Sequence, residues 1–372
     1  MKKEHLLVIR FSALGDVAMA VPVVYSLARQ YPEIRITVLS RGYARPLFED
    51  LAPNVGFMEA DVKREYKGVR GLNALYRRLA AKQFTAVADL HNVLRSEFLR
   101  MRFNMGRYRV EHINKHRKGR RRITSTLNKK LTQQPSSFQN YVEVFERLGY
   151  SINIQFTSIF PKGGGDLSLL PEEFITQHLS PITHCVPHSD LQVREHPSPT
   201  THLIGIAPFA AHKGKIYPPA LMQQVIAQLT QQHPDTRIFL FGRGEQEDHY
   251  FGEWCQAFPQ CVNVGQHLKT MREELILMSH LDVMLSMDSA NMHLASLTGI
   301  PVVSIWGATH PYAGFMGWGQ SWNNAIQLDM DCRPCSIFGQ KPCRFGDYPC
   351  LNNIKPEMVV EKINTLLLTK NT

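Results

Sequence analysis

A carboxylate follows the short loop of small residues in RFSALGDVAMAVP, residues 10–22. An apolar run ends at this loop, and an apolar helical stretch begins at Asp16. A carboxylate between a strand and a helix can accept a proton from a substrate hydroxyl. The alternative interpretation is that Asp16 only caps the first helix.

A second segment that could do chemistry is LSMDSANMHLASLTGIPVVSIWGATHP, residues 285–311. The pattern predicts a buried strand that ends at Asp288 and a helix of small residues with Ser289 as its N-cap. The free backbone N–H groups at the start of such a helix can bind a diphosphate. The alternative is ordinary capping of a core helix.

Two further strand ends carry charged residues. In IAPFAAHKGKIYPPALM, residues 206–222, the loop holds Lys213 and Lys215. A lysine there can reach a phosphate, although a solvated loop lysine is the alternative. LFGRGEQED, residues 240–248, ends a strand with glycines and Glu245. A carboxylate at such a strand end can accept hydrogen bonds from ribose hydroxyls.

Strand and helix signals alternate twice along the chain, and this alternation would position those residues. Continuous apolar runs, which are typical of strands buried in a parallel sheet, occur at 5–10, 35–40, 84–90, 202–208, 237–242, 282–287 and 302–307. Helical patterns lie between them. We therefore predict two doubly wound α/β domains, 1–165 and 166–372, which share a ligand cleft at the carboxyl ends of their strands. Residues 166–201 are expected to be a linker and a surface excursion.

The overall composition indicates a basic globular protein. The chain has 372 residues, of which 44% are hydrophobic, and a formal net charge of +10. This excludes wholesale disorder and favours an anionic partner. No apolar run is long enough to cross a bilayer, and the run in MKKEHLLVIRF is too short for the core of a signal peptide. We expect a cytoplasmic protein.

The strongest cluster of positive charge is KHRKGRRRITSTLNKK, residues 115–130, with eight lysines and arginines and no acid. We interpret it as a patch for a phosphorylated or carboxylate-bearing saccharide or an anionic lipid, with a solvated loop as the alternative. Nucleic acid is not expected, because no RNA-binding motif accompanies the run. The strand at 84–90 is followed by polar residues that are candidate contacts for the same saccharide or lipid, namely His91, Asn92, Arg95 and Ser96.

Two patterns could suggest a metal ion. Cys332, Cys335, Cys343 and Cys350 could hold a structural zinc, but the wide spacing of the second pair favours reduced packing cysteines. Asp329 and Asp331 form an Asp-x-Asp pattern, and nothing places it beside the phosphate segments. We predict that no metal or other cofactor is required.

Together these segments resemble the bacterial heptosyltransferases of glycosyltransferase family 9, which have the GT-B fold. The resemblance is sharpest at residues 6–30 and 203–311. It is carried by the following residues: Ser12, Ala13, Leu14, Gly15, Asp16, Lys215, Tyr217, Pro218, Gly242, Glu245, Asp288, Ser289, Ala290, His293, Ala295, Gly307, Thr309 and Pro311. Ala308 and His310 stand where the family pattern has a proline and an aspartate.

The resemblance implies two Rossmann-like domains and an inverting, metal-independent transfer of heptose, usually from ADP-heptose, to the lipopolysaccharide inner core. It implies Asp16 as the catalytic base. The implied donor contacts are Lys215, Glu245, Asp288, Ser289, Ala290, His293 and Thr309, and the implied acceptor contacts are Ser12, Ala13 and Gly15 with His91, Asn92 and Arg95. A lipopolysaccharide acceptor also implies peripheral contact with the inner face of the cytoplasmic membrane.

Three alternatives remain beside this interpretation. The chain could be a glycosyltransferase for a different nucleotide sugar. It could be a nucleotide-sugar epimerase on the same scaffold, which would turn over the donor without an acceptor. It could also be a non-catalytic protein that binds a nucleotide sugar, in which case substitution of Asp16 would leave donor binding unchanged.

Overall fold

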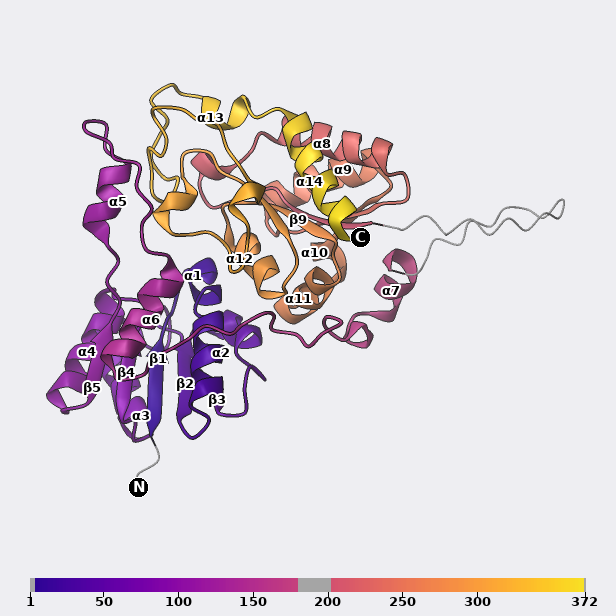
Figure 1. Cartoon of the computed structure of the whole chain (residues 1–372). Helices are drawn as coiled ribbons and strands as arrows, with labels where there is room; N and C mark the ends of the chain where they lie inside the picture. Colours follow the sequence, from indigo (N-terminus) through magenta and orange to yellow (C-terminus); the bar gives the residue numbers. More distant parts are fainter. Residues whose placement is uncertain (1–3, 180–201, 371–372) are drawn as a thin grey trace. The chain divides into compact units, whose positions relative to one another are not determined.

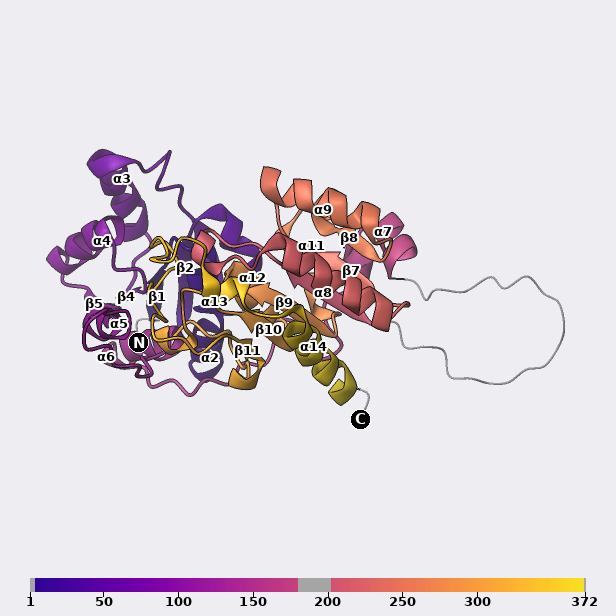
Figure 2. The ribbon, with the colours of Figure 1, turned by 90° about the horizontal axis from the view of Figure 1, so that it is seen from above.

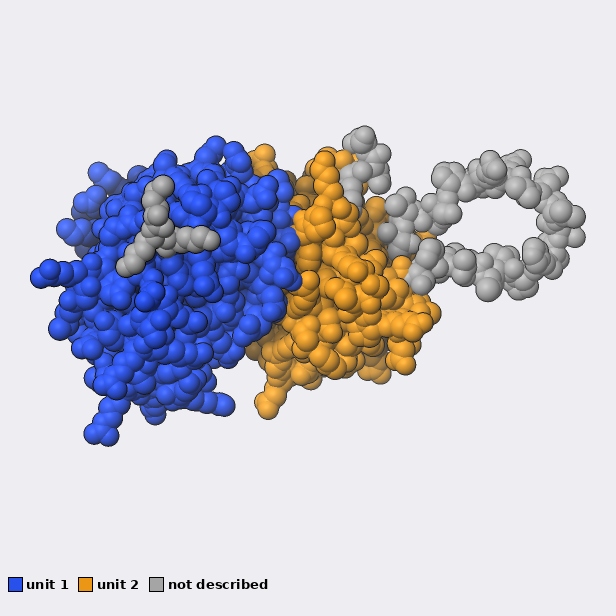
Figure 3. Space-filling model, turned by 90° about the horizontal axis from the view of Figure 1, so that it is seen from below, with its two compact units in different colours: residues 1–159, 310–319 blue, residues 160–309, 320–372 orange. Residues whose placement is uncertain are grey.

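The computed structural model describes residues 4–179 and 202–370, which form two compact units (Figures 1 and 3). Unit 1 is Met1–Ile159 with His310–Gly319, and unit 2 is Phe160–Thr309 with Gln320–Thr372. The sequence analysis places 310–319 in the second domain and does not anticipate its return to unit 1. Most of the predicted Pro-, Ser- and His-rich excursion, residues 180–201, lies outside the described residues.

Unit 1 is built on a five-stranded sheet of order β3-β2-β1-β4-β5, in which every strand pairing is parallel. Its elements are β1 (His5–Ile9), α1 (Leu14–Ala18), α2 (Val21–Gln30), β2 (Arg35–Ser40), η1 (Gly42–Leu47), β3 (Val55–Glu59), α3 (Gly68–Ala80), β4 (Ala86–Asp89), α4 (Leu94–Met105), β5 (Arg109–His112), α5 (Arg117–Ile123), α6 (Ser137–Arg147) and η4 (Pro311–Ala313).

The central strands of unit 1 are covered by helices on both faces. Helices α3 and α4 lie on one side of the strands, and α2 and α6 lie on the other (Figure 2). All residues of β1 and β4 are buried, which explains why apolar residues run from Leu6 to Ile9 and from Ala86 to Ala88 without alternation. The edge strands β3 and β5 contain exposed residues, and their weaker signal is absent from the sequence prediction.

The helical stretch that the sequence predicts from Asp16 onward is not one helix, because the structure has two helices there. α1 ends at Ala18, and α2 begins at Val21 with Pro22 in its first turn. A proline has no backbone N–H to donate and fits only the first turn of a helix, so the chain restarts the helix at this point.

Unit 2 is built on a six-stranded sheet of order β11-β10-β9-β6-β7-β8, again with parallel pairings. Its elements are η2 (Leu167–Leu169), α7 (Glu172–His178), β6 (Leu203–Ala207), η3 (Lys213–Lys215), α8 (Pro219–Gln232), β7 (Arg237–Leu240), α9 (Glu245–Ala257), β8 (Cys261–Asn263), α10 (Val264–His267), α11 (Met271–Ser279), β9 (Val283–Met287), α12 (Ala290–Leu297), β10 (Val302–Ile305), η5 (Trp322–Asn324), β11 (Ala325–Ile326), α13 (Pro349–Asn352) and α14 (Pro356–Lys370).

The predicted strands and helices of the second half agree closely with unit 2. β9 and β10 are fully buried, and α8 and α14 pack together over the sheet. The continuous apolar runs of this half therefore report strands with two covered faces. Among the described residues, no helix has both the length and the apolarity that crossing a membrane requires.

Candidate functional site

The sheet of unit 1 has its topological switch point between β1 and β4. The chain leaves β1 toward β2 on one side, whereas β4 pairs with β1 on the other side. Loops that leave two such strands diverge, and the crevice between them is where open α/β sheets bind ligands. Asp16 follows β1, and His91 follows β4, so the structure brings both predicted residues to this switch point.

Asp16 lies in the first turn of α1 and forms an ion pair with Arg10. The Asp16 side chain is 29% exposed, whereas that of Arg10 is only 6% exposed. The N–H of Ala13 donates to Asp16 Oδ2 at 3.4 Å, and the hydroxyl of Tyr141 donates to the Asp16 carbonyl oxygen at 3.0 Å. Ala13 is the N-cap residue of α1, and the Asp16 carboxylate in its first turn accepts the Ala13 N–H, so Asp16 takes part in capping the helix. A buried cation also holds this partly exposed carboxylate.

Arg10 is a site residue that the sequence analysis missed. It donates from Nη1 to the Leu90 carbonyl, and so joins the ends of β1 and β4. Its guanidinium lies 5.9 Å from the centre of the Tyr141 ring. Burial, the largest single influence, lowers the pKa of Arg10, but Asp16, Tyr141 and Asp89 together outweigh it and the pKa is raised. The sequence does contain a signal for Arg10, because a charged residue that directly follows a wholly buried strand is a candidate site residue.

The loop after β4 is held by a buried carboxylate. Asp89 Oδ1 accepts hydrogen bonds from the N–H groups of His91 and Asn92, each at 2.9 Å, and Arg100 pairs with Oδ2 at 3.3 Å. His91 Nε2 lies 3.5 Å from the hydroxyl of Ser12. Burial and then the positive charges around His91, those of Arg10 and Lys115 first, lower its pKa to about 3. The imidazole is therefore neutral near pH 7.

The remaining acceptor candidates divide between this switch point and its surroundings. Ser12, Ala13 and Gly15 belong to the loop and first turn that carry Asp16. Asn92 lines a neighbouring pocket. Arg95 is exposed on the first turn of α4, and only its charge reaches His91. These residues stay candidates.

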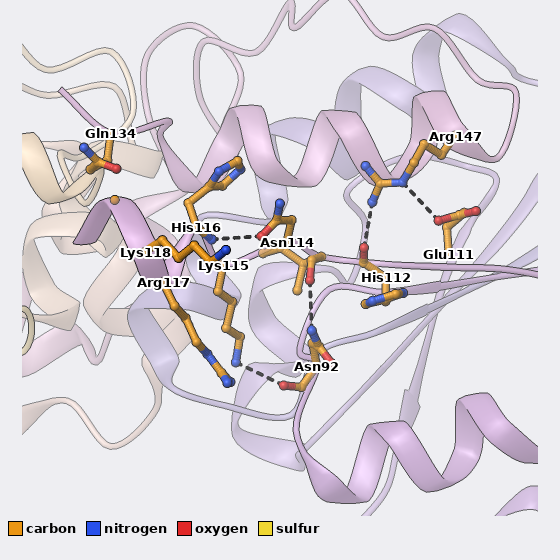
Figure 4. A pocket seen from close by; sticks show the side chains of 12 residues that line it. Asn92, Glu111, His112, Asn114, Lys115, His116, Arg117, Lys118, Gln134 and Arg147 are labelled. Atoms are coloured by element: carbon orange, nitrogen blue, oxygen red, sulfur yellow. Dashed lines mark hydrogen bonds and ion pairs between the residues drawn. The ribbon is translucent and has the colours of Figure 1, made fainter. Parts of the chain in front are cut away.

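A basic pocket of about 740 Å³ opens beside the β4–β5 end of the unit 1 sheet (Figure 4). Lys115, Arg117 and Lys118 line it, and the side chains of Lys115 and Arg117 run in parallel toward Asn92. Lys115 Nζ donates to the Asn92 carbonyl at 3.3 Å. Burial, and then the charges of Arg10 and Arg117, lower the pKa of Lys115.

The acid in the pocket lining does not neutralise these lysines and arginines. Glu111 is paired with Arg147, whose Nε lies 3.0 Å from its carboxylate. The pocket therefore presents an excess of positive charge to a ligand, as expected of an anion site. It uses the start of the basic run that the sequence analysis assigned to an anionic saccharide or lipid.

The switch point of unit 2 lies between β6 and β9. Lys215, in the loop after β6, pairs with Asp288, which directly follows β9, at 2.8 Å. Their side chains are 14% and 4% exposed. Ser289 is the N-cap of α12, but its hydroxyl contacts Ser286 at 3.3 Å and makes no capping hydrogen bond. The N-terminus of α12 is thus left without a side-chain cap beside a lysine.

The loop that carries Lys215 is closely packed against two other loops of unit 2. The Gly214 carbonyl accepts from the N–H of Ala308 at 2.8 Å. Gly339 has a φ of 78°, and a Cβ there would lie 2.7 Å from Lys215 Cγ. A glycine is needed at 339 for both reasons. This packing fixes the stem of Lys215.

Arg333 is a second positioning residue that the sequence analysis missed. It is 5% exposed and donates to three carbonyls of the loop after β10, those of Trp306 (3.0 Å), Gly307 (2.6 Å) and Thr309 (3.0 Å). Burial lowers the pKa of Arg333. Its side chain determines the shape of the loop in which Thr309, a donor candidate, is fully buried.

The other candidate donor contacts differ in how far they are buried. Ala290 is in the first turn of α12, and His293 is 6% exposed on the same helix. Glu245 is exposed at the start of α9, after β7. The structure therefore groups Lys215, Asp288, Ser289 and Ala290 at one switch point, and Glu245 belongs to the adjacent strand end.

The late cysteines lie in the segment that braces the Lys215 loop. The N–H of Cys335 donates to the Ala308 carbonyl at 3.0 Å, and Cys350 is buried in the unit 2 core. Across residues 4–179 and 202–370, no three His, Cys, Asp or Glu side chains are grouped so that they could hold a metal ion. The zinc alternative at Cys332, Cys335, Cys343 and Cys350 and the metal alternative at Asp329 and Asp331 stay predictions.

Comparison with known proteins agrees with this fold. Lipooligosaccharide heptosyltransferase 2 of Campylobacter jejuni is 26% identical over 171 residues, which cover 44% of this chain and 51% of that protein. The chain thus spans about half the length of these curated relatives. The solved structure of E. coli ADP-heptose lps heptosyltransferase II aligns with a TM-score of 0.63 and 17% identity, over 99% of this chain and 100% of that chain.

A family 9 glycosyltransferase from Veillonella parvula aligns with a TM-score of 0.68 and 18% identity, over 99% of this chain and 98% of that chain. These likenesses confirm the predicted α/β fold class of the GT-B glycosyltransferases. The family model described as glycosyltransferase family 9 (heptosyltransferase) matches residues 72–348, which include the unit 2 switch point but not Asp16. The chain belongs to glycosyltransferase family 9.

Proposed function

We propose that this chain transfers heptose, or a closely related sugar, from ADP-heptose to the inner core of lipopolysaccharide. The observation that supports this most is that the two units carry switch points with complementary chemistry. Unit 1 offers a partly exposed carboxylate at Asp16, and unit 2 offers a lysine at a helix N-terminus. Sugar transfer needs a base for the acceptor hydroxyl and positive charge for the leaving diphosphate.

Asp16 is the proposed base. The acceptor oxygen attacks the anomeric carbon, its proton moves to the Asp16 carboxylate, and the bond from that carbon to the diphosphate oxygen breaks. A single displacement of this kind inverts the anomeric centre. Arg10 fixes the carboxylate from the protein side, so one edge of Asp16 remains for the hydroxyl. Arg10 is thus a positioning residue.

Lys215 and the N-terminus of α12 are the proposed donor site. The diphosphate gains negative charge as it leaves, so both groups stabilise the transition state more than the bound donor. Asp288 holds the lysine in place until the donor arrives. We propose that this positive charge makes a metal ion unnecessary, and transfer that persists in a chelator would support the point. A strict need for a divalent cation would contradict it.

The proposed acceptor is the anionic lipopolysaccharide core, with its phosphate or carboxylate groups in the basic pocket. The pocket supports this assignment because it holds Lys115, Arg117 and Lys118 beside the loop of His91 and Asn92. We further propose that the chain works in the cytoplasm at the inner face of the cytoplasmic membrane, where such an acceptor is anchored. Nucleic acid is not a proposed partner.

A panel of nucleotide sugars tests the donor, with thermal unfolding as the readout. A ligand that binds only the folded chain stabilises it by about 2.7 kcal/mol at a concentration of 100 Kd. ADP-heptose should therefore raise the melting temperature, and UDP-hexoses should not. Stabilisation by UDP-hexoses alone would contradict the assignment, and donor turnover without acceptor would indicate an epimerase.

Asp16→Asn tests the base. The variant should lose roughly 10³-fold in kcat, within the range that general base catalysis usually contributes, and should still bind the donor. Asp50→Asn is a matched control, because Asp50 is exposed and has a φ of 62°, which asparagine also tolerates. Near-normal turnover by Asp16→Asn would remove Asp16 from this role.

A further inference from the structure

Helix α4 has two apolar faces, and only one of them packs into unit 1. Leu99 and Phe103 are fully buried, whereas Leu94, Met101 and Met105 are 86%, 50% and 71% exposed. At about 100° per residue, the three exposed side chains lie within an arc of roughly 40°, nearly opposite Leu99 and Phe103. The exposed residues therefore form one continuous apolar stripe along the helix.

Positive charge flanks one side of this stripe, and on the other side the exposed Glu97 is paired with Arg100 at 3.6 Å. Arg95 is exposed on α4, and Arg102 of α4 stacks on Tyr76 of the neighbouring helix α3, 4.7 Å from the ring centre. Helix α3 lies on the same side of the sheet as α4 (Figure 2). Its residues Val69, Arg70 and Arg77 are exposed. Residues 63–107 contain eleven lysines and arginines against three acids.

We propose that this α3–α4 surface docks on an anionic lipid bilayer. The surface is defined by Val69, Leu94, Met101 and Met105 with Arg70, Arg77 and Arg95. Exposed apolar side chains with arginines beside them suit the boundary between acyl chains and acidic headgroups. A symmetric contact with a second copy of the chain would instead place this cationic face against itself, which like-charge repulsion disfavours.

The position of the surface in the chain fits a lipid-borne acceptor. Leu94 is three residues beyond His91, and His91 lies 3.5 Å from Ser12 beside Asp16. The stripe therefore begins next to the site at which the proposed acceptor hydroxyl reacts. This inference rests on the proposed function, because a membrane-anchored acceptor is what the docking would bring to Asp16.

Flotation of the full chain with lipid vesicles tests the docking. The wild type should float with vesicles of phosphatidylethanolamine and phosphatidylglycerol, and much less with phosphatidylcholine alone. Leu94→Gln/Met101→Gln/Met105→Gln should lower the vesicle-bound fraction at least ~10-fold, because each inserted side chain contributes through its buried area. Arg70→Gln/Arg77→Gln should weaken binding and reduce its sensitivity to salt.

A matched control is Met358→Gln/Leu368→Gln, which changes exposed apolar residues of α14, 39% and 69% exposed, in unit 2. It should float like the wild type. Equal flotation of the α4 triple variant, or equal binding to phosphatidylcholine, would overturn the proposal. So would a wild-type dimer that the triple variant dissociates while neither form binds vesicles.

A water-soluble core oligosaccharide without lipid separates this inference from the proposed function. The α4 triple variant should transfer to it as fast as the wild type does, and should lose activity only on acceptor embedded in vesicles. A wild type that transfers to neither acceptor would refute the proposed function, and flotation would still decide the docking. A triple variant equally active on both acceptors would overturn the docking.

Discussion

The two switch points contain the same motif with opposite polarity. In unit 1 the exposed partner of the ion pair is the carboxylate of Asp16, at 29%, and Arg10 is 6% exposed. In unit 2 the more exposed partner is Lys215, at 14%, and the carboxylate of Asp288 is 4% exposed. Each unit thus buries one charge to hold the other toward the ligand side of its sheet.

This difference teaches that a shared architecture does not determine the chemistry of its switch point. Both sheets place loops at the carboxyl ends of two diverging strands. Which partner is buried decides whether the site offers a base or a cation. The buried partner needs further contacts to offset its desolvation, and Arg10 obtains them from Leu90 and Tyr141.

The largest effect beyond that of Asp16 is expected from the cation of unit 2. Lys215→Ala should reduce kcat/KM by ~10²-fold, because the leaving diphosphate loses a charge-assisted contact. Steady-state kinetics with varied donor would measure the loss. Asp288→Asn should reduce kcat/KM less, since the lysine keeps its charge and loses only its anchor.

Lys213→Ala is the matched control for this prediction. Lys213 belongs to the same turn as Lys215 but is exposed. Its substitution should leave the kinetics unchanged. If Lys213→Ala and Lys215→Ala lowered kcat/KM equally, the net positive charge of the loop would account for the effect, and not the single lysine that Asp288 holds.

The strand ends and their reactive residues could be predicted from the sequence. A strand buried on both faces is a continuous apolar run, so its end is visible, and the first polar residues beyond it are placed at one edge of the sheet. Asp288 and Lys215 were found in this way, and the structure brings them together at 2.8 Å. The α/β class followed from the same alternation.

The contacts through which other residues position them could not be predicted. Arg333 is 24 residues from Thr309 in the chain, and only the folded loops show that it donates to the Thr309 carbonyl. Arg10 reads locally as the polar end of a strand, and its contact with Leu90 spans 80 residues. The apolar stripe of α4 was also hidden, because one helix with two opposite apolar faces has weak amphipathic periodicity.

An intermediate effect is expected from the neutral imidazole of His91. Its pKa is about 3 in the folded chain, against 6.5 as the ordinary value. The unfolded chain therefore binds the proton first, and folding stability is full above pH 6.5 and falls as the pH drops toward 3. At pH 5 this one group should cost about 2 kcal/mol. Urea unfolding at pH 7 and pH 5 would measure the difference.

His91→Gln should remove that part of the pH dependence, because glutamine takes up no proton. His249→Gln is the control, since His249 is 65% exposed on α9. The expected result ties acid sensitivity to unit 1, where a third positive charge would meet Arg10 and Lys115. A His91→Gln protein with wild-type acid sensitivity would show that protonation of His91 does not lower the free energy of unfolding.

The smallest effect is expected from substitutions in the basic pocket. They test whether unit 1 binds the acceptor while unit 2 binds the donor. Arg117→Gln/Lys118→Gln should raise the KM for the acceptor by roughly tenfold, and leave the KM for the donor unchanged, because solvated charges contribute modestly. The effect should shrink at high salt. Arg121→Gln/Arg122→Gln, on the same helix α5 but outside the pocket lining, is the matched control. A rise in the KM for the donor instead would mean that the positive charge of unit 1 also binds the diphosphate. The assignment of the acceptor to unit 1 and the donor to unit 2 would then be wrong.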